Sequence, residues 1–281
     1  MFLVRKYSAV AALYLVIGFA CNAQILDKNS EAEALLHGLF EQMTQSTADT
    51  EKEKICESVS RILDTVLTLA SSFDYPYDLL KNLGKVYSPD GNLRFYSWNL
   101  PYHDGTNHYY GYIQYKPENS KNVLVFKMSD KSDGLEDPES AVLNQNDWYG
   151  SLVYEIAQKE SGGIMYYLLL CYDPLNLFVS RKVIDILYFK EQNELVMGAP
   201  VFQVHDQVRC RVIFDYSARA QMVLKWVPSS NMIVFDHLSP ERPIYEGNFQ
   251  FYGPDFSYDG FVFENGYWKL VEDIDIRNNP E

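Results

Sequence analysis

Two histidines and an aspartate lie close together in one polar segment, Pro101-Tyr-His-Asp-Gly-Thr-Asn-His-Tyr109. His103 and His108 flank Asp104, and zinc accepts imidazole and carboxylate ligands. Their spacing matches no established zinc motif, and a polar turn between two strands accounts for the same residues. We therefore expect no metal here and keep His103 and His108 as candidate binding residues.

A second segment, Asp236-His-Leu-Ser-Pro240, brings together an acid, an imidazole and a hydroxyl. These are the parts of a hydrolase triad, but triad members meet through the fold and not as sequence neighbours. The Gly-x-Ser-x-Gly elbow that presents a nucleophilic serine is absent from the sequence. We expect this segment to be a turn after a strand and to contain no catalytic residue. Asp236 and His237 remain candidate binding residues.

The acidic segment 130–137 resembles a calcium loop in composition, but Gly134 stands where the fifth-position ligand is required.

Paired carboxylates could also cleave a glycosidic bond. With 38 Asp and Glu in the chain some such pair is inevitable, so composition does not support that chemistry. Neither a phosphate-binding glycine loop nor a dinucleotide fingerprint is present. We predict no metal and no cofactor.

Aromatic residues are the remaining binding signal. The chain has 22 Tyr, 16 Phe and 4 Trp, more than enough to fill strands and still line a surface. Tyrosine suits a binding surface because it offers an apolar face with a polar tip. Trp98, Tyr102, Tyr109 and Tyr110 surround one predicted loop, and we expect a neutral glycan or a peptide to bind there.

These candidates fall on short predicted strands. Helical periodicity ends near residue 85, and aromatic or β-branched runs then alternate with Gly, Pro, Asn and Asp. The close spacing leaves no room for crossover helices, so the sheet should be mostly antiparallel. Strands are predicted at residues 93–98, 109–115, 123–128, 152–158, 164–172, 181–189, 209–216, 221–227, 232–236, 249–252, 260–264 and 267–271, with a long surface loop at 129–147.

Two turns are explicit in the sequence. Ser88-Pro-Asp-Gly91 has the residue types of a tight turn, and Asn265-Gly266 between aromatic runs is a strong hairpin signal. That hairpin would place Phe261, Phe263, Trp268 and Leu270 on one core-facing side. The surrounding Tyr87-Ser-Pro-Asp-Gly-Asn-Leu-Arg-Phe-Tyr96 is similar to a β-propeller repeat, but it occurs clearly once, where a propeller needs several copies.

Before the strands, the sequence predicts an antiparallel helical hairpin. Ser30 with Glu33 and Thr50 with Glu53 have the spacing of capping boxes, and Pro76 is placed to open a short third helix. Six apolar residues recur at helical spacing and should be buried: Leu35, Leu39, Ile55, Val59, Ile62 and Val66. The fold class is therefore α+β, a sandwich or irregular barrel-like antiparallel sheet with an N-terminal helical hairpin; the alternative is propeller-like.

Residues 1–23 have the composition of a secretory signal, with Arg5 and Lys6 before a short apolar run. We favour cleavage after Ala23; the alternative is a lipidated Cys21 that anchors the protein to a membrane. The expected organisation is a signal at 1–23, a helical segment at 24–84 packed on the sheet, and an antiparallel β domain at 85–281. No later stretch is long and apolar enough to be a membrane helix.

The net charge of −14 argues against binding to nucleic acid, which needs a basic surface. The cysteines beyond the signal add little. Cys171 and Cys210 each fall in an apolar run, so we expect buried small hydrophobic residues. A disulfide between Cys171 and Cys210 is the alternative.

The signal, with Ala23-Gln24 at its end, and the tail Phe251-Tyr-Gly-Pro-Asp-Phe-Ser-Tyr-Asp-Gly-Phe261 resemble uncharacterised exported proteins of Bacteroides-type bacteria. The resemblance implies export to the periplasm or surface of a Gram-negative bacterium and carries no activity. Because catalytic motifs are missing, we favour a non-catalytic binding or structural protein over the alternative, a periplasmic hydrolase with an unrecognised site. The ligand, partner and oligomeric state stay open.

Overall fold

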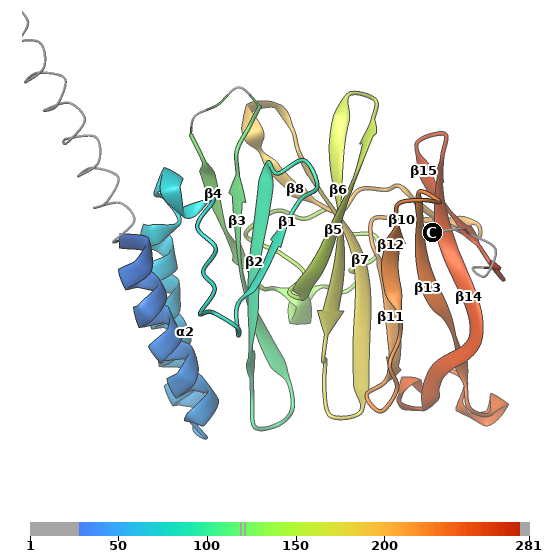
Figure 1. Cartoon of the computed structure of the whole chain (residues 1–281). Helices are drawn as coiled ribbons and strands as arrows, with labels where there is room; N and C mark the ends of the chain where they lie inside the picture. Colours follow the sequence, from blue (N-terminus) through green and yellow to red (C-terminus); the bar gives the residue numbers. More distant parts are fainter. Residues whose placement is uncertain (1–27, 119, 121, 276–281) are drawn as a thin grey trace, which may run out of the picture. The chain divides into compact units, whose positions relative to one another are not determined.

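The computed structural model describes residues 28–118, 120 and 122–275 (Figure 1). The expected signal and the Cys21 lipidation site lie outside the described residues. The chain divides into two compact units, unit 1 up to Asn82 and unit 2 from Leu83 onward. None of the described helices has the length and apolar character that crossing a membrane requires.

Unit 1 contains the predicted pair of helices. The described part of the first runs over residues 28–45, and α2 spans Asp49–Val66 after a link of only three residues. A short 3-10 helix, η1, follows at Ala70–Ser72. Met43 and Cys56 connect the two long helices, with their sulfur atoms 3.5 Å apart.

The buried stripes are partly as predicted. Ile55, Val59 and Val66 are buried, while Leu39 and Ile62 are half-buried. The prediction that Leu35 is buried is wrong: its side chain is 62% exposed, and the neighbouring Leu36 is fully buried. The buried face of the helix includes Leu36, Phe40 and Met43, which follow the helical spacing of apolar residues in the sequence.

The helix ends also differ from the prediction. Ser30 lies inside the first helix, and Ala48 precedes α2 without a side-chain cap. Glu33, expected to cap the helix, accepts hydrogen bonds from the Leu79 amide (2.7 Å) and the Tyr75 hydroxyl (2.8 Å). Residues 75–77 have irregular backbone and residues 78–79 form a turn, where a third helix was predicted. Tyr77 has a φ of 52°, which is incompatible with a right-handed helix.

Unit 2 consists of three sheets, in which the one parallel pairing among the described strands joins β15 to β9 (Figure 1). The first has the order β1-β2-β3-β4, formed by Gly84–Tyr87, Leu93–Pro101, Asn107–Tyr115 and Leu124–Ser129. The second has the order β11-β7-β6-β5 with β8 beside β7; its strands are β5 Leu152–Ser161, β6 Ile164–Asp173, β7 Val179–Phe189, β8 Leu195–Met197 and β11 Val212–Ser217. The third has the order β10-β9-β15-β14-β13-β12, formed by β9 Phe202–Val204, β10 Gln207–Arg209, β12 Leu224–Val227, β13 Met232–Pro240, β14 Tyr252–Glu264 and β15 Tyr267–Val271.

The second sheet is the middle layer of a sandwich. Along β6, Leu169 and Cys171 pack into a core shared with the first sheet, while Leu168 and Leu170 pack into a core shared with the third. Alternate residues of a strand face opposite sides, so a strand that is apolar at every position can fill two cores. This confirms the α+β class with a mostly antiparallel sandwich. The sheets differ in strand number and order, and the propeller alternative does not hold.

The closing hairpin is confirmed. Asn265 and Gly266 have φ values of 53° and 86°, as a two-residue turn of this type requires. Glu264 pairs with Tyr267 across the turn, and Phe261 and Trp268 are each 1% exposed on the core side. The paired strands extend further than predicted, because β14 begins at Tyr252.

Two predictions about the β region are wrong or incomplete. Residues 249–251 form a 3-10 helix, η5 (Phe249–Phe251), instead of a strand, and the Phe251 ring stacks on Tyr245 at 4.1 Å. The strands β1, β8, β9 and β10 were not predicted. The last three have only three residues each, too few to show a period of two.

The predicted loop at 129–147 is irregular, but it is not only surface. It covers the fully buried Arg211, whose guanidinium donates to the carbonyl oxygens of Pro138 and Ala141 and pairs with Asp185 at 3.2 Å.

Cys171 and Cys210 are both buried and form no disulfide. The expectation of buried thiols is therefore confirmed.

Candidate functional site

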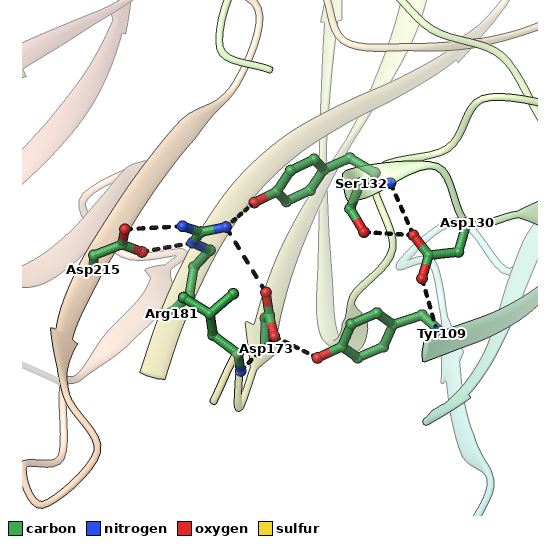
Figure 2. Close-up of polar contacts among 8 residues, drawn as sticks. Tyr109, Asp130, Ser132, Asp173, Arg181 and Asp215 are labelled. Atoms are coloured by element: carbon green, nitrogen blue, oxygen red, sulfur yellow. Dashed lines mark hydrogen bonds and ion pairs between the residues drawn. The ribbon is translucent and has the colours of Figure 1, made fainter. Parts of the chain in front are cut away.

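A row of three charged side chains crosses the end of the middle sheet (Figure 2). Asp173 ends β6, Arg181 lies opposite it near the start of β7, and Asp215 lies opposite Arg181 on β11. The Arg181 guanidinium donates to both carboxylate oxygens of Asp215, at 2.5 and 2.9 Å, and lies 4.0 Å from Asp173. The strand register alone therefore places one arginine between two carboxylates.

Two tyrosines complete this network. Tyr109, on β3 of the first sheet, donates its hydroxyl hydrogen to Asp173, and Tyr149 accepts a hydrogen bond from Arg181. Asp173 also accepts from the Leu175 amide at 2.6 Å. The polar network, defined as these five side chains Tyr109, Tyr149, Asp173, Arg181 and Asp215, thus joins two sheets at one end of their shared core.

Burial and mutual charge shift the pKa values of the network. Burial raises the pKa of Tyr109 above its usual range, and the charge of Asp173 adds to this shift. Burial also raises the pKa of Asp173, which the hydrogen bond from Tyr109 only partly offsets. For Tyr149, burial raises the pKa to about 12 against the opposing charge of Arg181. Burial lowers the pKa of Arg181, but its bonds to Asp215 raise it overall.

Such shifts can mark a catalytic site, but here each charged group is already bound to another. None of the five side chains lines either of the two cavities described below. A buried ion pair with its hydrogen bonds made is typical of structural networks as well as of active sites. The arrangement joins the first and second sheets at one end of their shared core.

Of the predicted candidates on the first sheet, Tyr109 belongs to this network. The Tyr109 amide donates to Asp130 at 2.9 Å, and His108 lies 3.4 Å from the same carboxylate. Trp98 is 1% exposed and stacks on Tyr110, with ring centroids 5.0 Å apart. Tyr102 and His103 begin the loop that joins β2 to β3, with Tyr102 half-buried and His103 exposed.

The two predicted imidazoles are not brought together with a shared carboxylate. Asp104, expected between them, accepts hydrogen bonds from the Thr106 hydroxyl and amide, which lowers its pKa. Within the described residues, no group of three or more His, Cys, Asp or Glu side chains is arranged to hold a metal ion.

Asp236 and His237 do not interact as the sequence pairs them. The Asp236 carboxylate accepts from the Val223 amide at 2.7 Å, whereas His237 Nδ1 lies 2.7 Å from Asp259 on the neighbouring strand. That hydrogen bond raises the pKa of His237. The described hydrogen bonds of His237 join it to Asp259 and not to a serine.

A groove of about 640 Å³ lies at the end of unit 2 where β6 and β7 are joined. We call it the turn groove. One wall carries Leu177 and Phe178 of the β6–β7 turn, which are 70% and 64% exposed. Facing residues belong to η5 and the start of β14, and the full lining is Leu177, Phe178, Ser217, Arg219, Ala220, Glu241, Gln250, Phe251, Tyr252, Gly253 and Pro254.

The walls of the turn groove are held in place by local hydrogen bonds. Asn176 Oδ1 accepts from the amides of Phe178 and Val179, at 2.9 and 3.0 Å, which fixes the turn. On the other wall, the Tyr252 hydroxyl accepts from the Gly247 amide at 2.9 Å. The apolar side chains are thus presented by ordered backbone.

Sequence reasoning missed the turn groove. The available signal was the turn Pro174-Leu-Asn-Leu-Phe178, which carries three large apolar residues where a turn between strands usually has polar ones. The facing wall comes from residues more than 60 positions later in the chain, and no local pattern connects the two. Comparison of the chain with protein-family models, curated proteins and solved structures finds no match.

Proposed function

We propose that this chain is an exported, non-catalytic binding protein whose turn groove holds an apolar segment of a peptide. The observation that carries the proposal is the exposure of Leu177 and Phe178 on a fixed turn opposite Phe251 and Tyr252. Large apolar side chains that are ordered yet exposed beside a concave surface are typical of binding sites.

The lining favours a peptide over a glycan. Its charged residues are one arginine and one glutamate, so the lining has no net formal charge. Leu177, Phe178, Phe251 and Pro254 are four of its eleven residues, and they suit apolar side chains of a peptide. A glycan platform more often uses Trp or Tyr with polar neighbours, and the groove lining contains one Tyr and no Trp.

The absence of catalysis is also part of the proposal. In the polar network, Asp173 and Arg181 have shifted pKa values, and the charged groups there bind one another or a tyrosine. The turn groove contains neither a cysteine nor a histidine. A nucleophile and a base within hydrogen-bond reach are the minimum for covalent catalysis, and the described hydrogen bond of the Ser217 hydroxyl is one that it accepts from the Arg219 amide.

Export and location are proposed from the sequence. Residues 1–23 support delivery to the periplasm or surface of a Gram-negative bacterium, with Cys21 as the alternative lipid anchor. We expect the mature protein to begin at Gln24. Intact-mass measurement on protein exported from a bacterial host checks this: a diacylglycerol adduct on Cys21 identifies the anchored form, and a mass that retains residues 1–20 contradicts export.

Peptide-display selection followed by titration tests the binding proposal. Selected peptides should be enriched in apolar and aromatic residues, and Phe178→Ser should weaken their binding at least about tenfold, because it removes an exposed aromatic contact. Val208→Ser is the matched control, since Val208 is 49% exposed on β10 and does not line the groove. Peptides that bind both variants equally contradict the site, and a glycan that binds in a Phe178-dependent way changes the ligand class.

A further inference from the structure

A second cavity, of about 390 Å³, lies at the opposite end of the strands from the turn groove. We call it the acidic cavity. It opens where β2 and β6 begin and where β3, β5 and β7 end. The lining is Asp90, Asn92, Tyr115, Glu118, Glu160, Gly163, Ile164, Met165, Tyr167 and Phe189.

The formal charge of the lining is entirely negative. Asp90, Glu118 and Glu160 contribute three carboxylates from three separate segments, and no Lys, Arg or His is among the lining residues. Asp90 is fixed in the predicted Ser88–Gly91 turn, where it accepts hydrogen bonds from the Tyr167 hydroxyl at 2.9 Å and the Asn92 amide at 3.0 Å. One carboxylate therefore has a set orientation, while Glu118 and Glu160 are exposed at the rim.

The tyrosines of the cavity respond to this charge. Burial raises the pKa of Tyr115, and the charges of Asp90 and Glu118 raise it further. Tyr167 is shifted in the same direction, again by burial first and Asp90 second. A site in which negative charge disfavours a phenolate will favour a cation by the same electrostatic interaction.

Apart from Asn92 and Gly163, the rest of the lining is aromatic or apolar. Tyr115 and Phe189 stack with their ring centroids 3.8 Å apart, and Met165 and Ile164 lie on the β5–β6 hairpin. Aromatic faces attract organic cations, and a thioether and an aliphatic chain pack against methylene groups. The cavity thus combines an anionic rim with a wall that suits a hydrocarbon body.

A metal ion is a poorer fit than an organic cation. Calcium takes six to eight oxygen ligands at roughly 2.3–2.6 Å. Among the described residues, three or more acidic side chains do not converge at such a distance in this cavity or elsewhere. Separated carboxylates suit a molecule that carries its positive charges several bonds apart.

We propose that the acidic cavity binds an organic amine, with an alkyl body along Tyr115 and Phe189 and an ammonium group paired with Glu118 or Glu160. The volume is within the range of small-ligand sites, and the net charge of −14 favours the approach of cations. A free diamine and a lysine side chain of a peptide share this chemistry. The proposal does not rest on the turn groove, because the two sets of lining residues have no member in common.

Calorimetric titration of the mature protein tests the proposal with matched ligands. Cadaverine carries two ammonium groups on a five-carbon chain, and 1,5-pentanediol is its neutral counterpart of similar length. We expect cadaverine to bind, with an affinity that falls as salt rises, and pentanediol not to bind. N-acetyl-lysine methylamide is the third ligand; if it binds more tightly than cadaverine, a peptide lysine is the source of the amine.

Charge-neutralising variants locate the site. The double variant Glu118→Gln, Glu160→Gln should weaken cadaverine binding at least about tenfold, since hydrogen bonds to charged groups are lost. Glu191→Gln is the control: Glu191 belongs to η3 (Glu191–Asn193), two residues beyond Phe189, and does not line the cavity. Its affinity should stay within about twofold of the unmodified protein, and unchanged thermal melting of all variants shows that they fold.

Several results would overturn the proposal. They are no measurable binding of either amine at millimolar concentration, equal binding of pentanediol, or equal loss of affinity in the Glu191→Gln control. Displacement of cadaverine by an equimolar amount of calcium would show a metal site instead. Phe178→Ser should leave cadaverine binding unchanged, so a failure of the turn groove and a failure of the acidic cavity are distinguishable.

Discussion

The β6–β7 hairpin carries two regions of opposite character within nine residues. At its strand ends, Asp173 and Arg181 belong to the polar network: Asp173 accepts from Tyr109, and Arg181 donates to Asp215 and lies beside Asp173. In the turn between them, Leu177 and Phe178 are largely exposed. The strong pKa shifts belong to the first region, and the exposed apolar surface belongs to the second.

The difference separates two kinds of unusual residue. Charges that leave water must be compensated at once, so a buried charge in a stable fold normally has its partner in the same chain. An exposed apolar side chain costs much less free energy than an unpaired buried charge, so it can remain exposed until another molecule binds it. On this hairpin, the shifted pKa values of Asp173 and Arg181 therefore belong to the structural region, and the exposed Leu177 and Phe178 belong to the proposed binding region.

The largest expected effect comes from removing the central charge of the network. Arg181→Ala leaves Asp173 and Asp215 without their cation, and loss of one partner from a buried ion pair costs about 3 kcal/mol or more. Urea unfolding should show this loss in the free energy of unfolding. Arg219→Ala, in the turn groove, is the control and should change it by no more than about 0.5 kcal/mol. A loss below about 1 kcal/mol for Arg181→Ala would mean that the network is not structural.

A smaller loss is expected for Tyr109→Phe. This change removes one hydroxyl and leaves the Asp173 carboxylate with one fewer donor, which typically costs about 1–2 kcal/mol at a buried site. Tyr267→Phe serves as the matched control, because Tyr267 is 42% exposed near the closing turn. Equal stability of Tyr109→Phe and the unmodified protein would show that the Tyr109–Asp173 hydrogen bond contributes nothing.

The pH dependence of stability sharpens the comparison further. Burial raises the pKa of Asp173 above its unfolded value of about 3.9. Between that value and the higher folded pKa, the native state keeps a proton that the unfolded chain has released. The contribution of Asp173 is therefore fully present below about pH 3.9 and is lost as pH rises through its folded pKa.

Asp173→Asn removes this contribution, because asparagine does not titrate. Urea unfolding between pH 4 and pH 7 should give a less negative slope of stability against pH for the variant than for the unmodified protein. Asp206→Asn, in the exposed β9–β10 turn, should keep the original slope. If the slopes of all three proteins agree, Asp173 has no raised pKa in the folded state.

The sequence predicted the parts of the fold that local chemistry determines. Asn265-Gly266 has φ values that few other residue pairs adopt easily, so it defines both a turn and the register of its strands. The long strands β2, β3, β5, β6 and β7 were recognised for a similar reason, since aromatic and β-branched runs bounded by turn residues are typical of strands. In contrast, Leu35 and Leu36 are both apolar, and a shift of one residue in a helix changes which of them is buried.

The candidate site depended on information that no local pattern contains. The register that places Asp173, Arg181 and Asp215 in a row is set by the β6–β7 hairpin and by the pairing of β7 with β11, a strand that comes later in the chain. His237 meets Asp259, 22 positions later, where the sequence offered Asp236 beside it. The two walls of the turn groove come from distant parts of the chain, and the second wall includes the start of β14, which pairs with β13.

The smallest effect on stability is expected in the turn groove itself. Phe178→Ser removes a side chain that is already 64% exposed, so little apolar area returns to water on unfolding. The turn survives the change, because Asn176 binds the backbone amide of residue 178 and not its ring. The free energy of unfolding should therefore change by less than about 0.5 kcal/mol, the range of ordinary surface substitutions, while the solubility of the protein rises. A loss above about 1 kcal/mol in urea unfolding would show that Phe178 belongs to the core. The hairpin would then have no exposed apolar region to contrast with the polar network, whose groups bind one another.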